Sequence, residues 1–290
     1  MPTYHRVAAP PAPRAPTDAE LAELAQVAKR LREERRARSR HRFVACTVAL
    51  AVFTALWMSR DQWLHLVTSD DPYQATPAAN FPIGDEGIVM PAPTALPDVP
   101  VSTVADALLQ VRRALHAAYL DDAMLVRHDP GPLLSLLAPD SAKVVRTTYE
   151  RGGYGTTMVR LAPGTSLAGP PRVSGRTRFA QVDWRGTPAV DVTTNYVLVY
   201  ALNSPDGVVV IHSATHWMFP QGRNLLPSSR GMYLGRTQGY WQGMDCTTSA
   251  TGLTAAAPKH DRGANPNFTD DDPDAYFDPH RSVRVGAGCR

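Results

Sequence analysis

The sequence predicts an α+β domain that follows a single transmembrane helix. Three observations lead to this prediction. Residues 43–58 carry no charge, Gly or Pro, residues 103–151 place apolar side chains at helical spacing, and residues 156–241 change to a period of two. A run of helices followed by a run of antiparallel strands is typical of the α+β class.

Residues 43–67 are expected to form the membrane span, with residues 43–58 as its core. A helix over that core rises about 24 Å, a little less than the roughly 30 Å of hydrocarbon in a bilayer. Arg42 and Arg60 can extend toward the headgroups, and Trp57 suits the membrane interface. The alternative is a buried helix of a soluble protein, but no other segment of the chain could surround such a helix on all sides.

The distribution of charge predicts how the span is oriented. Residues 1–42 hold ten Arg or Lys residues against five Asp or Glu residues, so the basic pI of 8.8 originates there and does not indicate a nucleic-acid-binding domain. Arginines cluster directly before the span, which keeps the N-terminus in the cytoplasm. A cleaved signal peptide is the competing interpretation, but the 42 residues before the span are long for such a peptide. The nearest candidate cleavage site, around Ala75 to Ala79, lies too far downstream. We expect an uncleaved signal anchor in the cell membrane, with the C-terminus outside the cytoplasm.

The segments beside the span differ from each other. Thr17 and Glu20 form a capping-box pattern, and the apolar spacing after it predicts an amphipathic cytoplasmic helix over about residues 18–41. Residues 68–100 are rich in Pro, which predicts an extended, semi-rigid linker with a reach of about 90 Å.

Only three of the 30 basic residues are Lys, and this Arg-, Ala- and Pro-rich composition is typical of a high-GC bacterial genome.

Residues 101–249 are expected to hold the folded external domain. Helical spacing runs from Thr103 until two prolines interrupt it, and it resumes up to about Arg151. Five strands are predicted from the alternation that follows: 156–162, 173–184, 189–202, 208–219 and 232–241. A turn at residues 203–207 would join the third and fourth strands as a hairpin. Residues 250–290 are polar and acidic with little periodicity, so we expect an irregular tail.

Two N-terminal helices that lead into a strongly bent antiparallel sheet resemble the cone-shaped, cystatin-like fold of the nuclear transport factor 2-like superfamily. With a cytoplasmic tail and one span in front, the layout resembles two groups of envelope proteins. One is the bitopic inner-membrane subunits of type IV secretion and conjugation machines, and the other is the small membrane proteins associated with mycobacterial cell-entry transport systems. The resemblance covers roughly residues 101–243 and rests on architecture without a diagnostic motif. It implies a domain that self-associates or contacts partner subunits without catalysis.

The sequence lacks the local signatures of several enzyme classes. It contains no G-x-x-x-x-G-K phosphate loop, no G-x-S-x-G elbow, no H-E-x-x-H pair and no C-x-x-C pair. These patterns would mark a nucleotide enzyme, a serine hydrolase, a zinc protease or a redox or metal site. We therefore expect no cofactor and favour a role without catalysis.

Five polar residues on the predicted strands remain as candidates for acid–base chemistry. His212 and His216 lie four residues apart, which on a strand separates them by about 13 Å, too far to share one metal ion. We therefore expect no metal site. Some soluble members of the superfamily use Asp, Tyr and His in a concave pocket of the sheet. The residues that could be placed in such a pocket here are Asp191, Asn195, Tyr196, His212 and His216.

The three cysteines divide between the span and the exterior. Cys46 lies within the predicted span, where it acts as a small apolar residue. Cys246 and Cys289 both fall outside the membrane, where oxidising conditions permit a disulfide. We predict that they pair and join the C-terminal tail to the domain.

These observations predict a single-pass envelope protein whose external domain binds other envelope proteins or itself, in a secretion, conjugation or transport assembly. The lipid bilayer is its other partner, and no nucleic acid is expected. The alternative is a membrane-tethered enzyme or small-ligand binder that uses the concave face of the sheet. A pocket on which Asp191 and His212 converge would favour the alternative, whereas a cone filled with side chains would favour the interaction domain.

Overall fold

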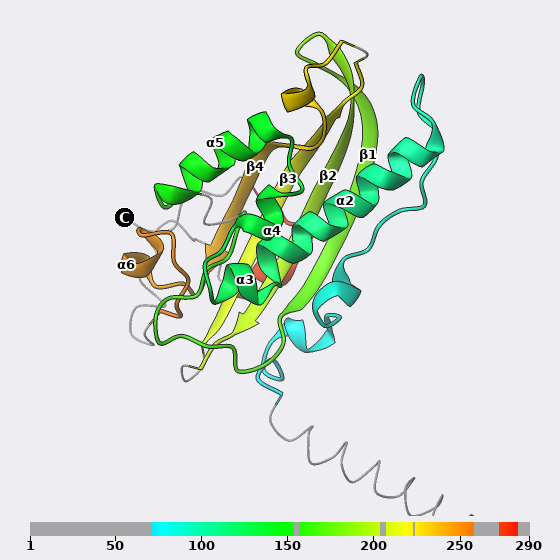
Figure 1. Cartoon of the computed structure of the whole chain (residues 1–290). Helices are drawn as coiled ribbons and strands as arrows, with labels where there is room; N and C mark the ends of the chain where they lie inside the picture. Colours follow the sequence, from blue (N-terminus) through cyan, green and yellow to red (C-terminus); the bar gives the residue numbers. More distant parts are fainter. Residues whose placement is uncertain (1–70, 154–156, 204–206, 223, 258–272, 284–290) are drawn as a thin grey trace, which may run out of the picture. The chain divides into compact units, whose positions relative to one another are not determined.

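A four-stranded antiparallel sheet with the order β1-β2-β3-β4 is the framework of the fold (Figure 1). Its strands are β1 (Arg172–Trp184), β2 (Thr187–Ala201), β3 (Val208–Pro220) and β4 (Tyr233–Gln242). The computed structural model describes residues 71–153, 157–203, 207–222, 224–257 and 273–283, which belong to a unit that starts at Asp70. Within these ranges no helix is long and apolar enough to cross a membrane. The predicted span and the predicted cytoplasmic helix lie outside them.

Short helices accompany one long helix that lies along one face of the sheet (Figure 1). The α-helices are α2 (Val101–Tyr119), α3 (Asp122–Leu125), α4 (Gly131–Leu134), α5 (Pro139–Glu150) and α6 (Cys246–Ser249). The 3-10 helices are η2 (Pro77–Asn80), η3 (Gly84–Gly87), η4 (Pro227–Ser229) and η6 (Pro273–Phe277). The predicted α+β class and antiparallel sheet are confirmed.

The core fills the space between α2 and the sheet. One side of α2 buries an apolar stripe, and β2 buries every second side chain against it from Val190 onward. Trp217 of β3 is fully buried there, and its indole N–H donates to the Thr194 hydroxyl at 3.0 Å. Because the side chains of a strand alternate between two faces, this packing fixes which residues of β2 and β3 face away from α2. We call the face of the sheet opposite α2 the outer face.

The hairpin between β1 and β2 is closed by a two-residue turn. Arg185 and Gly186 both adopt positive φ, at 57° and 75°. The Asp183 carboxylate accepts a hydrogen bond from the Gly186 N–H at 2.9 Å. Positive φ at both central residues is the geometry that matches the twist of an antiparallel pair. The register of β1 on β2 is continuous from this turn to the pair Arg172–Val199.

The first predicted strand, 156–162, is wrong. This segment forms one isolated bridge, between Leu161 and Thr254. Two of its backbone N–H groups donate to carbonyls at the ends of two helices. The Val159 N–H donates to the Ala118 carbonyl at 3.0 Å, and the Leu161 N–H donates to the Leu125 carbonyl at 2.8 Å. Helix termini leave carbonyls without partners inside the helix, and this apolar segment satisfies two of them while it is buried in the core.

The proline-rich segment 71–100 differs from the extended linker that we expected. It packs against the sheet and contains η2 and η3, so the folded unit begins near residue 70 and not at residue 101. Tyr73 is fully buried, and Ile83 forms an antiparallel bridge with Arg172 of β1. Proline is compatible with this structure because it occurs at turns and at the start of η2, where a missing N–H costs little. The expected reach of about 90 Å is lost, since the segment that would supply it is folded.

The C-terminal tail is partly packed, although little of it forms regular structure. Thr254 and Ala257 are buried, and the Ala257 N–H donates to the Gly243 carbonyl at 2.8 Å. Residues 273–283, here called the strap, contact η2 and β3 on the outer face. Tyr276 and Phe277 are the buried side chains of the strap. These two aromatic residues supply the apolar contact that an acidic tail without periodicity did not predict.

Candidate functional site

The sheet separates the sequence-predicted site residues onto two faces. Tyr196 belongs to the core beneath α2. Thr193 pairs with His216 and Val197 pairs with His212, which places both histidines on the outer face. Asp191 and Asn195 alternate with Tyr196 along β2 and therefore lie on the outer face as well. Tyr196 cannot act together with either histidine in one pocket.

Tyr196 anchors the segment that precedes α2. Its side chain is buried, and its hydroxyl donates to the Val89 carbonyl at 2.8 Å. The Thr177 hydroxyl lies 2.9 Å from the same oxygen. Burial raises the pKa of Tyr196, so the hydroxyl stays protonated and acts as a hydrogen-bond donor. This geometry gives Tyr196 a structural role between β2, β1 and residues 88–90.

His212 is enclosed between the sheet and the strap. Its imidazole has no exposed surface. One ring nitrogen contacts the Asn195 side-chain carbonyl, and the other lies 3.1 Å from the Tyr240 hydroxyl. Asn195 can only accept through that oxygen, so the facing nitrogen of His212 carries the proton. Burial lowers the pKa of His212 to about 4, with Asp278 opposing this shift and Arg281 adding to it.

The strap closes the site around His212 with aromatic contacts. The Tyr240 ring packs edge-on against His212 at 5.1 Å and against Tyr276 at 5.7 Å between ring centroids. The Arg281 guanidinium lies over the Tyr276 ring at 4.3 Å. Such cation–π contacts hold a charged side chain against an aromatic face. His212 is therefore a buried, neutral part of the packing between strap and sheet.

Asp191 and His216 form a partly exposed titratable pair on the outer face. His216 Nδ1 lies 2.8 Å from Asp191 Oδ2, and the Thr193 hydroxyl lies beside both, 3.4 Å from the ring nitrogen and 3.5 Å from the carboxylate oxygen. The His216 side chain is 40% exposed, whereas that of Asp191 is 12% exposed. The carboxylate orients the imidazole through Nδ1, and Nε2 has no hydrogen bond within the described ranges. Among the described residues, no group of three or more His, Cys, Asp or Glu side chains could hold a metal ion.

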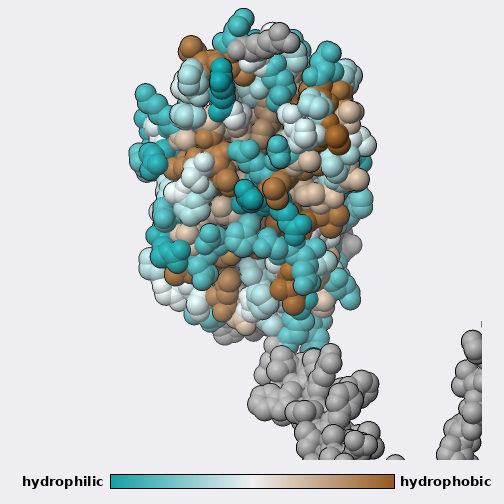
Figure 2. All heavy atoms as spheres, turned by 45° about the vertical axis from the view of Figure 1, so that its right-hand side comes forward, coloured by the Kyte–Doolittle hydropathy of each residue, from teal (hydrophilic) through white to brown (hydrophobic). Residues whose placement is uncertain are grey.

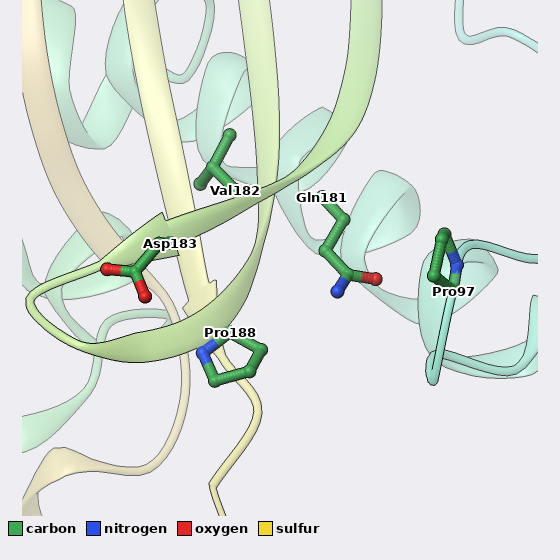
Figure 3. Close-up of a pocket in the computed structure, with 5 residues that line it drawn as sticks. All are labelled: Pro97, Gln181, Val182, Asp183 and Pro188. Carbon is green, nitrogen blue, oxygen red and sulfur yellow. The ribbon is translucent and has the colours of Figure 1, made fainter.

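A shallow pocket lies at the end of the sheet where the β1–β2 hairpin turns (Figure 3). Its volume is about 360 Å³, and it is lined by Pro97, Gln181, Val182, Asp183 and Pro188. The Gln181 side-chain oxygen is buried and accepts no hydrogen bond within the described part of the chain. The sequence prediction missed this pocket because it assigned Pro97 to a linker. Alternation along β1 could have placed Gln181 on the same face as Val173, Thr177 and Phe179.

Large side chains fill the face of the sheet that a concave ligand site would use. Trp217, Tyr119, Tyr200 and Met124 are fully buried between the sheet and the helices. Tyr119 donates to the Ser213 hydroxyl at 2.9 Å, and Tyr200 donates to the Tyr119 carbonyl at 3.1 Å. Burial raises the pKa of both phenols, so they stay neutral. Their hydroxyls are satisfied by protein groups, which leaves this region as packed core.

The chain matches no protein-family model, no curated protein and no solved structure.

The predicted Cys246–Cys289 disulfide stays a prediction, because Cys289 lies outside the described residues. Cys246 begins α6, whose N-terminus is capped by Asp245, a carboxylate that accepts from the Thr248 N–H at 2.7 Å. Mass spectrometry of the non-reduced protein after proteolysis should find the two cysteine peptides joined. Quantitative alkylation of both thiols without reductant would contradict the pairing.

Proposed function

We propose that this chain is a single-pass membrane protein of the bacterial envelope, and that its folded external domain binds other proteins. The domain would have the bent, cone-shaped arrangement of the cystatin-like fold and would act in a secretion, conjugation or transport assembly. The filled space between α2 and the sheet carries this proposal. An enzyme or small-ligand binder that used this face would need an opening where Trp217, Tyr119 and Tyr200 now pack.

The exposed surface also supports a role in protein binding without an obligate apolar interface. Seven large hydrophobic side chains of the described residues are exposed: Ile83, Val89, Val101, Leu109, Val126, Val144 and Leu226. Figure 2 shows hydrophobic residues in separate patches that are interrupted by hydrophilic ones. Interfaces between proteins that also exist apart are mixed in this way. A partner would therefore be recognised by directional polar contacts as well as by apolar area.

Recovery of partners from membranes tests this proposal. The tagged full-length chain should be cross-linked in cells, extracted in mild detergent and compared by quantitative mass spectrometry with a matched chimera. The chimera keeps residues 1–70 and carries an unrelated folded domain in place of residues 71–290. Envelope proteins should be enriched with the native chain only. Equal recovery from both proteins would contradict binding through the external domain.

The proposed topology makes a separate prediction. A reporter that is active only outside the cytoplasm should be active when it is fused after Arg290 and inactive when it is inserted after Pro16, because the arginines before residue 43 retain the N-terminus inside. A cytoplasm-specific reporter at the same two positions is the control and should give the opposite pattern. Activity of the first reporter at Pro16 but not at Arg290 would reverse the orientation.

A further inference from the structure

The first strand of the sheet has a free edge that is covered at one end only. β1 lies at the edge of the sheet, with β2 as its neighbour. At its beginning, the Val173 N–H donates to the Pro82 carbonyl at 3.0 Å, and the Gly84 N–H donates to the Pro171 carbonyl at 2.8 Å. Residues 82–84 thus already add a short antiparallel strand to β1. The backbone groups of odd-numbered residues in β1 point away from β2.

Beyond Val173, no backbone group of another described segment pairs with this edge. In a strand, every second residue directs its N–H and C=O to the same side, so five further residues point outward like Val173. These are Gly175, Thr177, Phe179, Gln181 and Asp183. In the described part of the chain, no hydrogen bond reaches their outward backbone groups. The open edge is about 27 Å long at 3.4 Å per residue, enough for a strand of ordinary length to pair with it.

The pocket of Figure 3 lies along this open edge. Gln181 and Asp183 belong to both, and Pro97 faces them across the pocket (Figure 3). A strand that paired with β1 here would direct one side chain or backbone N–H toward the Gln181 side-chain oxygen, which has no partner among the described residues. A buried acceptor without a partner costs free energy, and an arriving donor removes that cost. Pro97, Val182 and Pro188 give the pocket apolar walls, so it suits an apolar side chain.

The charges beside the edge indicate which strand would fit. Arg176 and Arg178 alternate with the outward-facing residues, and Arg178 is exposed. Neither guanidinium has a carboxylate within 4 Å among the described residues, although Arg176 contacts the His280 ring. Side chains directly opposite each other on paired strands interact, and opposite charges are favourable. Acidic residues are therefore favoured on the side of an added strand that faces these arginines.

The same charges disfavour pairing of the β1 edge with the β1 edge of a second copy of this chain. Two β1 edges in antiparallel contact would bring the arginines of both copies onto one face of the joined sheet. Like charges on neighbouring strands are unfavourable, and positive side chains on an edge strand are a known barrier to pairing between copies. A foreign strand with acidic side chains meets no such barrier.

We propose that the open edge of β1, from Gly175 to Asp183, binds an extended segment of a partner protein by strand addition. The segment carries acidic residues on the side of Arg176 and Arg178 and apolar residues on the side of the Pro97–Gln181 pocket. Backbone hydrogen bonds supply most of the contact, and the alternating side chains select the sequence. This inference rests on the proposed role in protein binding and assigns the surface that performs it.

A designed peptide tests the edge directly. The probe is a peptide of about nine residues with alternating Glu and Val, added to the full-length protein in detergent. The control peptide has the same sequence with every backbone nitrogen methylated, which removes the donors on both of its edges. Amide exchange should be fast at the outward residues of β1 in the free protein and slow at Phe179 and Gln181 after the probe binds. Equal binding of the methylated peptide, or protection elsewhere only, would refute strand addition.

Two variants and a matched control locate the interaction. Gln181→Pro removes an outward N–H without breaking a β1–β2 hydrogen bond, and it should weaken probe binding by roughly tenfold or more. Arg178→Glu should weaken binding several-fold at low salt and less at high salt. Arg146→Glu, at an exposed position of α5, makes the same change of charge and should leave binding unchanged. A uniform effect of both charge reversals would contradict the assigned surface.

The outcomes distinguish this inference from the broader proposal. Envelope partners that require residues 71–290 but are recovered equally with Gln181→Pro and Arg178→Glu would refute the edge and leave the proposed function standing. Protection of the β1 edge that grows with protein concentration in the absence of the probe would show pairing between copies and refute a foreign strand. Loss of a cross-linked partner in both variants, but not in Arg146→Glu, would support the inference.

Discussion

A fragment that begins at residue 101 is expected to lose cooperative folding, whereas residues 71–290 should melt in a single transition. The first 30 residues of the domain contribute buried side chains to two parts of the core. Tyr73 and Ala78 pack beneath the outer face, and Ile88 and Val99 pack in the main core with α2. Removing them exposes the matching surface of the sheet to water.

The free energy of unfolding that the shorter fragment is expected to lose is comparable to the whole stability of a domain. Full burial of a large apolar side chain contributes about 1.5–3 kcal/mol. Tyr73, Ile88 and Val99 together therefore contribute roughly 4.5–9 kcal/mol on that scale, against a typical net stability of about 5–15 kcal/mol. Tyr73 adds hydrogen bonds, because its oxygen accepts from the Ala201 N–H at 3.0 Å and its hydroxyl lies 3.0 Å from the Pro170 carbonyl. Burial raises the pKa of Tyr73 to about 12, so it remains a neutral phenol.

Single substitutions within the fragment of residues 71–290 test the contribution of side-chain packing without shortening the chain. Tyr73→Ala should lower the free energy of unfolding by about 3 kcal/mol or more, because it leaves a cavity and an unpaired Ala201 N–H. Val89→Ala is the control, since Val89 is 59% exposed and its loss should change stability by about 0.5 kcal/mol or less. Chemical denaturation followed by circular dichroism measures both. A fragment from residue 101 that folds as stably as residues 71–290 would show that the segment is a dispensable linker.

Alternation made most of the sheet predictable. The predicted strands 173–184, 189–202, 208–219 and 232–241 agree with β1 to β4 to within about two residues at each end. Each of these strands has one face against a core, so its sequence carries a clear period of two. The segment 156–162 shows a similar composition but pairs with helix ends, a partner that a local pattern does not reveal.

Proline content misled the prediction for residues 71–100. The density of Pro excluded long helices and strands, which is correct, because the segment contains only short 3-10 helices and turns. The density of Pro did not exclude packing of this segment against the sheet. Tyr73 is the residue that decides the outcome, since it is buried and bonded to strands about 100 or more positions away in sequence. Contacts at that separation follow from the tertiary fold and leave no local signal.

The five candidate residues lie on two faces of the sheet. Five polar residues on neighbouring strands were predictable, and alternation along β2 already separates Tyr196 from Asp191 and Asn195. One residue of offset between Asn195 and Tyr196 places them on opposite sides. The close pairing of Asp191 with His216 could be expected once β2 and β3 were aligned, because they lie diagonally across the two strands. The burial of His212 could not be expected from this alignment, because the residues that enclose it belong to the strap.

Acid is expected to destabilise the domain through His212. Burial holds the pKa of this histidine at about 4, whereas in the unfolded chain it returns to about 6.5. Above pH 6.5 the imidazole is neutral in both states, and stability does not depend on it. Between pH 6.5 and pH 4 the unfolded chain binds a proton that the folded protein does not. The free energy of unfolding should therefore fall by about 1.4 kcal/mol per pH unit, to a total of about 3 kcal/mol at pH 4.

A variant without the titrating group isolates this contribution. His212→Gln keeps a side-chain N–H that can donate to Asn195, but it takes up no proton in this range. Across pH 6.5 to 4, the native domain should lose about 3 kcal/mol relative to the variant, measured by denaturant titration of residues 71–290 at each pH. His216→Gln, at a half-exposed position of the same strand, retains His212 and should keep the loss. Parallel pH profiles for the native domain and His212→Gln would mean that His212 is hydrated in solution, and that the strap does not enclose it.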